Sequence, residues 1–288
     1  MQHNLKSILF TPLSFRVIIT RIKLKEHRQE RFMAAFRIRL AGKTIKVESI
    51  YEYVKKMCRS YICESDREDF QVTCSNKDIA YEKSRETEDG EFSDDYLESL
   101  SIYRSIAEQM LEYSTFLMHA AVVAVGDEAF MFTAASGVGK TTRVRIWLDQ
   151  IEESYVVNGD KPLIRITDEE VIACGTPWSG KEKMNTNTEV PLRSIILLER
   201  SEETSLTKIS FSEAIVPLFA QIYRPKDPLL MTKTIQLVRQ LDKRVDIYRY
   251  RSNLNDTDMR KVYETIRSNN KKGCPRHSAG TKGDNIEA

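Results

Sequence analysis

Nine residues near the middle of the chain decide the fold, and they read AASGVGKTT at positions 134–142. An apolar stretch from Ala129 to Thr133 precedes them, and Thr141 to Leu148 has the spacing of a helix. This order of strand, loop and helix predicts a phosphate-binding loop, with alanine in place of the usual first glycine. Gly137 and Gly139 permit the dihedral angles that turn successive backbone N–H groups inward, toward phosphate oxygens.

The residues of this loop have distinct expected roles. Lys140 supplies positive charge to the β and γ phosphates, and the hydroxyl of Thr141 is a ligand for Mg²⁺. The N-terminus of the following helix adds a partial positive charge. We therefore expect ATP and Mg²⁺ as cofactors. The alternative is that these residues form only a glycine-rich turn that leads into a helix. The expected nucleotide-binding residues are Ser136, Gly137, Val138, Gly139, Lys140, Thr141 and Thr142.

The strand before the loop is predicted to be the second arm of a hairpin. Only Gly126-Asp127-Glu128 separates it from an apolar strand over residues 117–125. GTPase-like folds instead place parallel strands side by side, which requires long crossovers. The guanine signature Asn-Lys-x-Asp does not occur in the sequence. The pattern therefore argues against a GTPase and favours another α/β nucleotide-binding fold.

The chain divides into two units with different patterns. Residues 33–113 predict a small α+β domain, and residues 114–268 predict the nucleotide-binding domain. Residues 1–32 form a basic extension, in which residues 15–22 alternate like a strand, and translation from Met33 is an alternative start. Residues 269–288 are predicted to be a disordered tail.

Individual elements follow from the local patterns. In the first unit, strands are predicted at 36–40, 44–47, 70–74 and 79–81, helices at 51–62 and 96–113, and an exposed acidic loop over 82–95. In the second unit, further strands are predicted at 155–157, 163–166, 171–174, 194–198 and 245–250, and helices at 229–241 and 257–266.

Composition limits the classes of function. The net charge is +2 over 288 residues, which gives no argument for nucleic acid or a membrane as a partner. No apolar run is long enough to span a bilayer. The five cysteines include no C-x-x-C pair and do not predict a disulfide framework, so we expect a reducing, cytoplasmic location.

Two residues of the second unit carry candidate chemistry. Asp160 ends a predicted strand, and ligands of open α/β sheets bind at the carboxyl ends of strands. A carboxylate there can bind Mg²⁺ and take a proton from an attacking hydroxyl; the alternative is a turn-forming Gly-Asp pair. His119 is the only histidine of the second unit, and a lone histidine between Met118 and Ala120 is commonly a core residue.

Several segments together resemble a known family. They are residues 119–123 (HAAVV), the loop at 136–142, residues 156–160 (VVNGD), residues 175–181 (GTPWSGK) and residues 245–249 (VDIYR). In this order they resemble the catalytic domain of HPr kinase/phosphorylase. They are more similar to uncharacterised HPr-kinase-like proteins with an added N-terminal α+β domain. The resemblance covers residues 33–268, and the wider family includes the phosphoenolpyruvate carboxykinases.

The resemblance implies roles for particular residues. His119 matches the active-site histidine beside the phosphates, and Asp160 the second acid of a pair that binds the metal and acts as general base. The first acid is replaced by Gly159, which leaves one carboxylate for both tasks, so strong metal binding and the reverse reaction, phosphorolysis, are not predicted. Residues 176–181 are predicted to form a mobile flap, in which Trp178 either stacks on a ligand or packs. Candidate cations for transition-state charge are Lys181, Lys183, Arg193 and Arg224.

The sequence therefore predicts an Mg·ATP-dependent kinase of the HPr kinase/phosphoenolpyruvate carboxykinase type, preceded by a small α+β domain. Its γ-phosphoryl acceptor is expected to be a hydroxyl of a protein, peptide or small molecule, with serine as one candidate. Expected catalytic residues are Asp160, His119 and Lys181, and expected metal ligands are Thr141 and Asp160. The alternatives are a carboxykinase that acts on a small carboxylic acid and a nucleotide-gated binding module without transfer activity.

Overall fold

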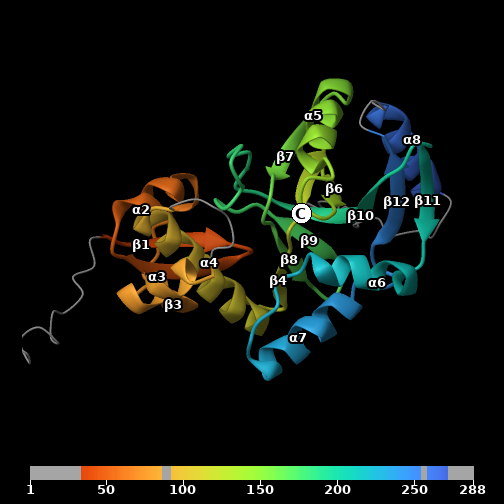
Figure 1. Ribbon diagram of the computed structural model, residues 1–288. Coiled ribbons are helices and arrows are strands. Elements are labelled where there is room, and N and C mark those ends of the chain that lie inside the picture. The colour runs from red at the N-terminus through yellow and green to blue at the C-terminus, as the bar shows by residue number, and fades with distance from the viewer. Residues whose placement is uncertain (1–33, 86–91, 254–257, 272–288) are drawn as a thin grey trace, which may run out of the picture.

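The chain folds into a mixed α/β structure in which a large curled sheet carries helices on both faces (Figure 1). The computed structural model describes residues 34–85, 92–253 and 258–271. The basic extension at 1–32 and its predicted strand lie outside the described residues, as does most of the predicted tail. In the part of the chain that is described, no helix is long and apolar enough to cross a membrane.

The first unit packs helices on a three-stranded sheet. Its strands are β1 (Ala34–Leu40), β2 (Lys43–Ser49) and β3 (Phe70–Thr73), in the order β1-β2-β3. Its helices are α2 (Glu52–Met57), α3 (Asn76–Lys83) and α4 (Asp94–Met110), with short 3₁₀ turns at Arg59–Tyr61 and Leu111–Tyr113. Helix α2 ends earlier than predicted and is followed by the first of these turns.

The predicted hairpin over residues 70–81 is wrong, because its second arm is helix α3. Ser75 precedes that helix, and its side chain and backbone N–H both bond to the carboxylate of Asp78. The Asp78 carboxylate thus reaches back to the residue before the helix, as in a capping box, so residues 75–78 start a helix rather than a turn.

The second unit is built on a nine-stranded sheet. Its main path runs β4-β8-β9-β10-β6-β5-β7, and β12 joins it beside β10, with β11 beyond. The strands are β4 (Thr115–Leu117), β5 (Ala121–Val125), β6 (Glu128–Thr133), β7 (Ser154–Asn158), β8 (Leu163–Ile166), β9 (Val171–Cys174), β10 (Glu189–Arg200), β11 (Ser205–Ile209) and β12 (Asp246–Ser252).

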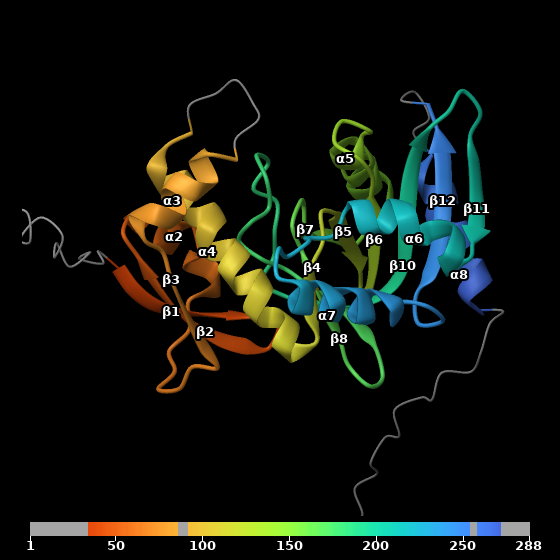
Figure 2. The same ribbon diagram turned by 60° about the horizontal axis from the view of Figure 1, so that its bottom comes forward.

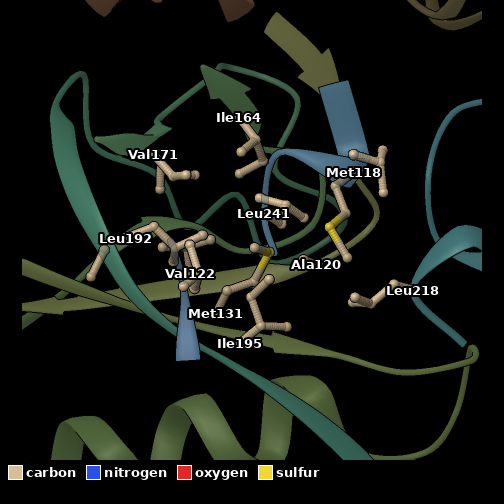
Figure 3. Packing of buried hydrophobic residues seen from close by; sticks show 14 of the residues in the cluster. Met118, Ala120, Val122, Met131, Ile164, Val171, Leu192, Ile195, Leu218 and Leu241 are labelled. Atoms are coloured by element: carbon tan, nitrogen blue, oxygen red, sulfur yellow. The ribbon is translucent and has the colours of Figure 1, made fainter. Parts of the chain in front are cut away.

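Four helices cover this sheet, two on each face. They are α5 (Lys140–Gln150), α6 (Phe211–Ala220), α7 (Pro228–Arg239) and α8 (Met259–Lys271). Alternate residues of β5 belong to different hydrophobic clusters: Val122 packs with α6 and α7, whereas Val123 packs with α5 and α8. The strands are therefore buried on both faces, as their continuous apolar runs require. Figure 3 shows the cluster on the α6 and α7 side.

The two units share one hydrophobic cluster. Leu117, Leu163, Cys174 and Trp178 of the second unit pack with the buried residues of α4 and of the three-stranded sheet. Figure 2 shows α4 reaching from the first unit to the side of the large sheet. The boundary near residue 113 therefore separates two different sheets, but the apolar core continues from one unit into the other.

Two strand predictions for the second unit are corrected, and two elements had not been predicted. The strand expected over 117–125 is broken into β4 and β5, and His119 lies in the break. Strand β10 begins at Glu189, because its first residues pair with β9 before the strand curves to pair with β6 and β12. Strand β11 and helix α6 were not predicted. The hairpin of β5 and β6 is confirmed.

Candidate functional site

The candidate site lies along one edge of the large sheet, and the strand directions explain why. Strand β5 is antiparallel to both of its neighbours, β6 and β7. The start of β5 and the ends of β6 and β7 therefore lie at the same edge. His119 precedes β5, the glycine loop (residues 134–139) follows β6, and Asp160 follows β7. The antiparallel pairing of these strands thus brings three separate segments of the sequence together.

The glycine loop has the backbone conformation that the sequence predicts. Gly137 and Gly139 have φ values of 77° and 113°, a region that side-chain-bearing residues rarely adopt. Helix α5 begins directly after Gly139. The loop side chains are accessible, since Ser136 and Thr142 are exposed, and Val138 and Thr141 are half-buried. The loop and the start of helix α5 are therefore accessible at this edge of the sheet.

Lys140 is folded back over the loop. Its Nζ donates a hydrogen bond to the backbone oxygen of Ala134 at 2.9 Å, so the ammonium group lies on the inner side of the turn. Burial lowers the pKa of Lys140, the nearby Asp160 carboxylate opposes this effect, and Lys161 adds to it. From the other side, Nη2 of Arg200 donates to the backbone oxygen of Gly137 at 2.6 Å. Two cations thus reach the loop.

Asp160 is held between two cationic or potentially cationic side chains. Its Oδ1 lies 3.3 Å from Nε2 of His119, and its Oδ2 lies 2.6 Å from Nζ of Lys161. Burial alone raises the pKa of Asp160, but the His119 hydrogen bond and the Lys161 charge outweigh it and lower that pKa from 3.8 to about 2. The carboxylate is consequently ionised at neutral pH and available as an acceptor or metal ligand.

A buried asparagine fixes the backbone of this turn. Asn158 is fully buried at the end of β7, and its Oδ1 accepts hydrogen bonds from the backbone N–H groups of Asp160 (2.9 Å) and Lys161 (2.7 Å). Its Nδ2 donates to the backbone oxygen of Thr176 at 2.9 Å. Such a turn, closed by a side chain on the backbone two residues further on, is a common use of asparagine.

His119 is oriented by Gln221, the residue that follows α6. Nδ1 of the ring lies 3.0 Å from Oε1 of Gln221, and the backbone N–H of His119 donates to the oxygen of Gln221 at 2.7 Å. Nδ1 thus faces Gln221 and Nε2 faces the Asp160 carboxylate, so both ring nitrogens have a polar partner. Met118 and Ala120, on either side of His119, anchor it in the hydrophobic cluster (Figure 3).

Position 159 has little room for a side chain. A Cβ atom at Gly159 would lie 3.2 Å from the backbone oxygens of both Met184 and Ser179. These contacts are tighter than ordinary van der Waals distances, and two backbone segments cannot easily give way. Position 159 is therefore a close backbone approach, and Asp160 is left as the carboxylate of this turn.

The predicted mobile flap over residues 176–181 is wrong. Thr176 and Ser179 are buried, and Trp178 is 5% exposed with its ring stacked on Tyr103 at 4.1 Å between centroids. Of the two alternatives expected for Trp178, the structure therefore shows packing. Gly180, by contrast, lies against Asp160, where an added Cβ would be 3.0 Å from the Cβ of Asp160.

The predicted cations separate into two groups. Lys181 and Lys183 are exposed on the turn that begins at Gly180, beside Asp160, so their role stays a prediction. The prediction for Arg193 is wrong, because this residue pairs with Glu128 at 2.8 Å, at the beginning of β6 and hence at the edge opposite the loop. Arg224 is exposed, and its role is untested.

Sequence reasoning missed Lys161, Gln221 and Arg200. Lys161 had a signal, since it directly follows Asp160 at the predicted strand end. Gln221 had a weaker one, because Ser210-x-x-Glu213 is the start signal of the unpredicted helix α6 that precedes it. Arg200 ends β10, which is parallel to β6, so its arrival at the same edge depends on a sheet order that the sequence alone does not give.

The donor set suits a magnesium ion shared with a phosphate ligand. Within the described ranges, no cluster of three or more His, Cys, Asp or Glu side chains could hold a metal ion. Mg²⁺ commonly takes one or two carboxylates together with substrate phosphates and waters, rather than an all-protein cage. Asp160 and the hydroxyl of Thr141 fit that pattern.

Comparison with known proteins adds little to this geometry. No family model matches the chain, and no curated protein matches it by sequence. Among solved structures, the chain is similar to the HPr(Ser) kinase/phosphatase from Coxiella burnetii, with 11% sequence identity and a TM-score of 0.31. The similarity covers 54% of this chain and 90% of that one. A likeness at this level leaves the function to be argued from the site itself.

Proposed function

We propose that this chain is an Mg·ATP-dependent kinase that transfers a γ-phosphoryl group to a hydroxyl acceptor. The observation that carries the proposal is the position of one ionised carboxylate, Asp160, at the sheet edge that also holds the glycine loop. Asp160 is close enough to Lys140 to affect its pKa. A phosphate-binding turn and a proton acceptor side by side are the two parts that phosphoryl transfer requires.

The chain's own residues would act by positioning and by charge. Backbone N–H groups of the glycine loop bind the phosphate oxygens, and Lys140 leaves the oxygen of Ala134 to reach them. The acceptor oxygen forms a bond to the γ-phosphorus, and the bond from that phosphorus to the β–γ bridging oxygen breaks, which releases ADP. Asp160 takes the proton of the hydroxyl, with His119 beside it.

Thr141 and Asp160 would be the ligands that the chain supplies to the magnesium ion. When bound, Mg²⁺ neutralises the charge that develops on the phosphate oxygens. Before that, Asp160 is neutralised by Lys161 at 2.6 Å. Lys161 is therefore released when Asp160 takes another partner, and its ammonium group becomes available to the phosphates.

The acceptor class that we test first is the serine hydroxyl of a protein or peptide. The rival enzyme function is a carboxykinase acting on a small carboxylic acid. A second candidate, a nucleotide-binding module without transfer, is favoured by one observation: the only carboxylate of the turn is already paired with Lys161, and Gly159 offers no second one.

The experiment is incubation of the full chain with γ-labelled ATP, Mg²⁺ and a library of serine-containing peptides, followed by product analysis. The proposal expects labelled phosphoester and ADP, and neither product with Lys140→Ala. Carbon dioxide released from added oxaloacetate would establish the carboxykinase instead. Tight ATP binding without any product would establish the binding module, and absence of ATP binding would overturn all three.

A further inference from the structure

Tyr103 connects the first unit to the turn that carries Asp160. It lies on α4 and is buried, and its ring is parallel to that of Trp178, with 4.1 Å between centroids and an interplanar angle of 0°. Nε1 of Trp178 donates to the backbone oxygen of Ser99, also on α4, at 3.0 Å. The two rings thus form a rigid contact that α4 holds from both ends.

The hydroxyl of Tyr103 reaches beyond this stack. It donates a hydrogen bond to the backbone oxygen of Lys161 at 2.6 Å, and Oγ1 of Thr176 donates to the same oxygen at 2.9 Å. Burial raises the pKa of Tyr103, so the hydroxyl keeps its proton. The backbone N–H of Lys161 is bound by Asn158. The backbone N–H of Lys161 is therefore fixed by Asn158 at the end of β7, and its backbone oxygen by Tyr103 of the first unit together with Thr176.

A second set of contacts braces the turn from the other side. The Tyr61 hydroxyl, from the first unit, donates to Oδ1 of Asn185 at 2.9 Å, and Nδ2 of Asn185 donates to Oγ of Ser179 at 2.8 Å. Next to Asn185, the backbone oxygen of Met184 accepts the N–H of Gly159 at 2.9 Å. The first unit therefore touches the segments on both sides of Asp160.

We infer that Tyr103 is a positioning residue, through which the first unit sets the place of the Asp160 carboxylate and the Lys161 ammonium group. The inference deepens the proposed function and rests on it. The first unit is then a structural part of the catalytic site, rather than only a module that recruits a substrate. Small displacements of a reacting group are costly, since about 1 Å can reduce a rate about a hundredfold.

The test compares two tyrosine-to-phenylalanine changes. Tyr103→Phe keeps the ring and removes only the hydroxyl that bonds Lys161. Tyr113→Phe is the matched control, because Tyr113 belongs to the same unit, stacks on Phe70 and donates to a backbone oxygen, that of Asp69, at 3.1 Å. Loss of a tyrosine hydrogen bond is common to both variants, whereas contact with the turn belongs to Tyr103 alone.

Three quantities are measured for both variants and the parent: thermal unfolding, the steady-state constants for ATP, and backbone hydrogen exchange at residues 159–161. We expect Tyr103→Phe to reduce kcat about tenfold to a hundredfold, to leave the KM for ATP nearly unchanged and to accelerate exchange in the turn. Tyr113→Phe should change none of these. Equal effects in the two variants, or a Tyr103→Phe variant with parental kcat and exchange, would overturn the inference. If the parent shows no transfer, the proposed function fails, while the exchange result still decides whether Tyr103 fixes the turn.

Discussion

His119 and Asp160 are joined through their side chains, and the residue after His119 is joined to Asp160 through the backbone. Nε2 of His119 lies 3.3 Å from Oδ1 of Asp160, and the N–H of the next residue, Ala120, donates to the backbone oxygen of Asp160 at 3.0 Å. The first contact depends on protonation, whereas the second does not. The pair therefore keeps its geometry when a proton moves, which is what a proton-accepting site needs.

Lys140→Ala should abolish high-affinity ATP binding and leave the fold intact. The side chain is half-buried and its Nζ bonds only a loop oxygen among the described residues, so its loss removes charge from the phosphates without opening the core. Calorimetric titration with Mg·ATP measures the affinity, and circular dichroism checks the fold. Lys208→Ala, at an exposed surface ion pair, is the control and should bind like the parent. Unchanged affinity of Lys140→Ala would remove the phosphate-loop assignment.

Asp160→Asn should separate binding from chemistry. Asparagine keeps the size and one oxygen but cannot accept the proton, so ATP affinity should survive within a few fold while turnover falls by roughly 10²–10⁴. The measurement is kcat and Kd over a magnesium titration. A pure metal role would appear instead as a raised magnesium requirement that excess metal restores. Parental values for both would reduce Asp160 to a turn residue.

Lys161→Met should raise the affinity for magnesium and lower turnover. Methionine has a similar length but no charge, so Asp160 loses the cation that lies 2.6 Å from its Oδ2. A metal ion then has no ammonium group to displace, and half-saturation should occur at a lower magnesium concentration. Turnover at saturating magnesium should fall at least about tenfold if the ammonium group stabilises phosphate charge. A higher magnesium requirement would contradict this account.

The central part of the fold could be predicted because its signals are local. Gly137 and Gly139 constrain the backbone themselves, and three residues between apolar strands leave room only for a hairpin. Asp160 was found because a strand end is visible as a change from Val157 to Gly159. The three-residue break that frees His119 from a strand was not visible, since residues on both sides of it are apolar.

The remainder depended on contacts between distant segments. Trp178 has the same sequence neighbours whether it stacks on a ligand or on Tyr103, and only the packing of α4 decides between them. Residues 79–81 favour a strand by propensity, but the Ser75 and Asp78 capping pair at the preceding residues prevails. Gln221 and Arg200 reach the site through the order of strands and helices, which no local pattern encodes.

The last prediction concerns Glu98, whose carboxylate is fully buried on α4 and accepts the backbone N–H groups of Ile50 and Tyr51 ahead of α2. Burial raises its pKa above the ordinary value of 4.5, and the two N–H bonds only partly oppose this. Between 4.5 and the raised pKa, the folded chain holds more protons than the unfolded chain. Stability contributed by this group is therefore lost as the pH rises through that window.

Glu98→Gln has no such proton, so its free energy of unfolding should rise relative to that of the parent as the pH rises from 4.5 through the raised pKa of Glu98. Urea unfolding of both proteins at several pH values measures the difference, and Glu112→Gln, at an exposed glutamate, controls for the change of net charge. The free energy of unfolding of the parent should be highest, relative to that of Glu98→Gln, at about pH 4. There the Glu98 carboxyl group is protonated and uncharged, as the glutamine side chain is. A difference that stays constant, or that moves in favour of the parent with rising pH, would mean that the two N–H bonds, and not burial, govern this carboxyl group.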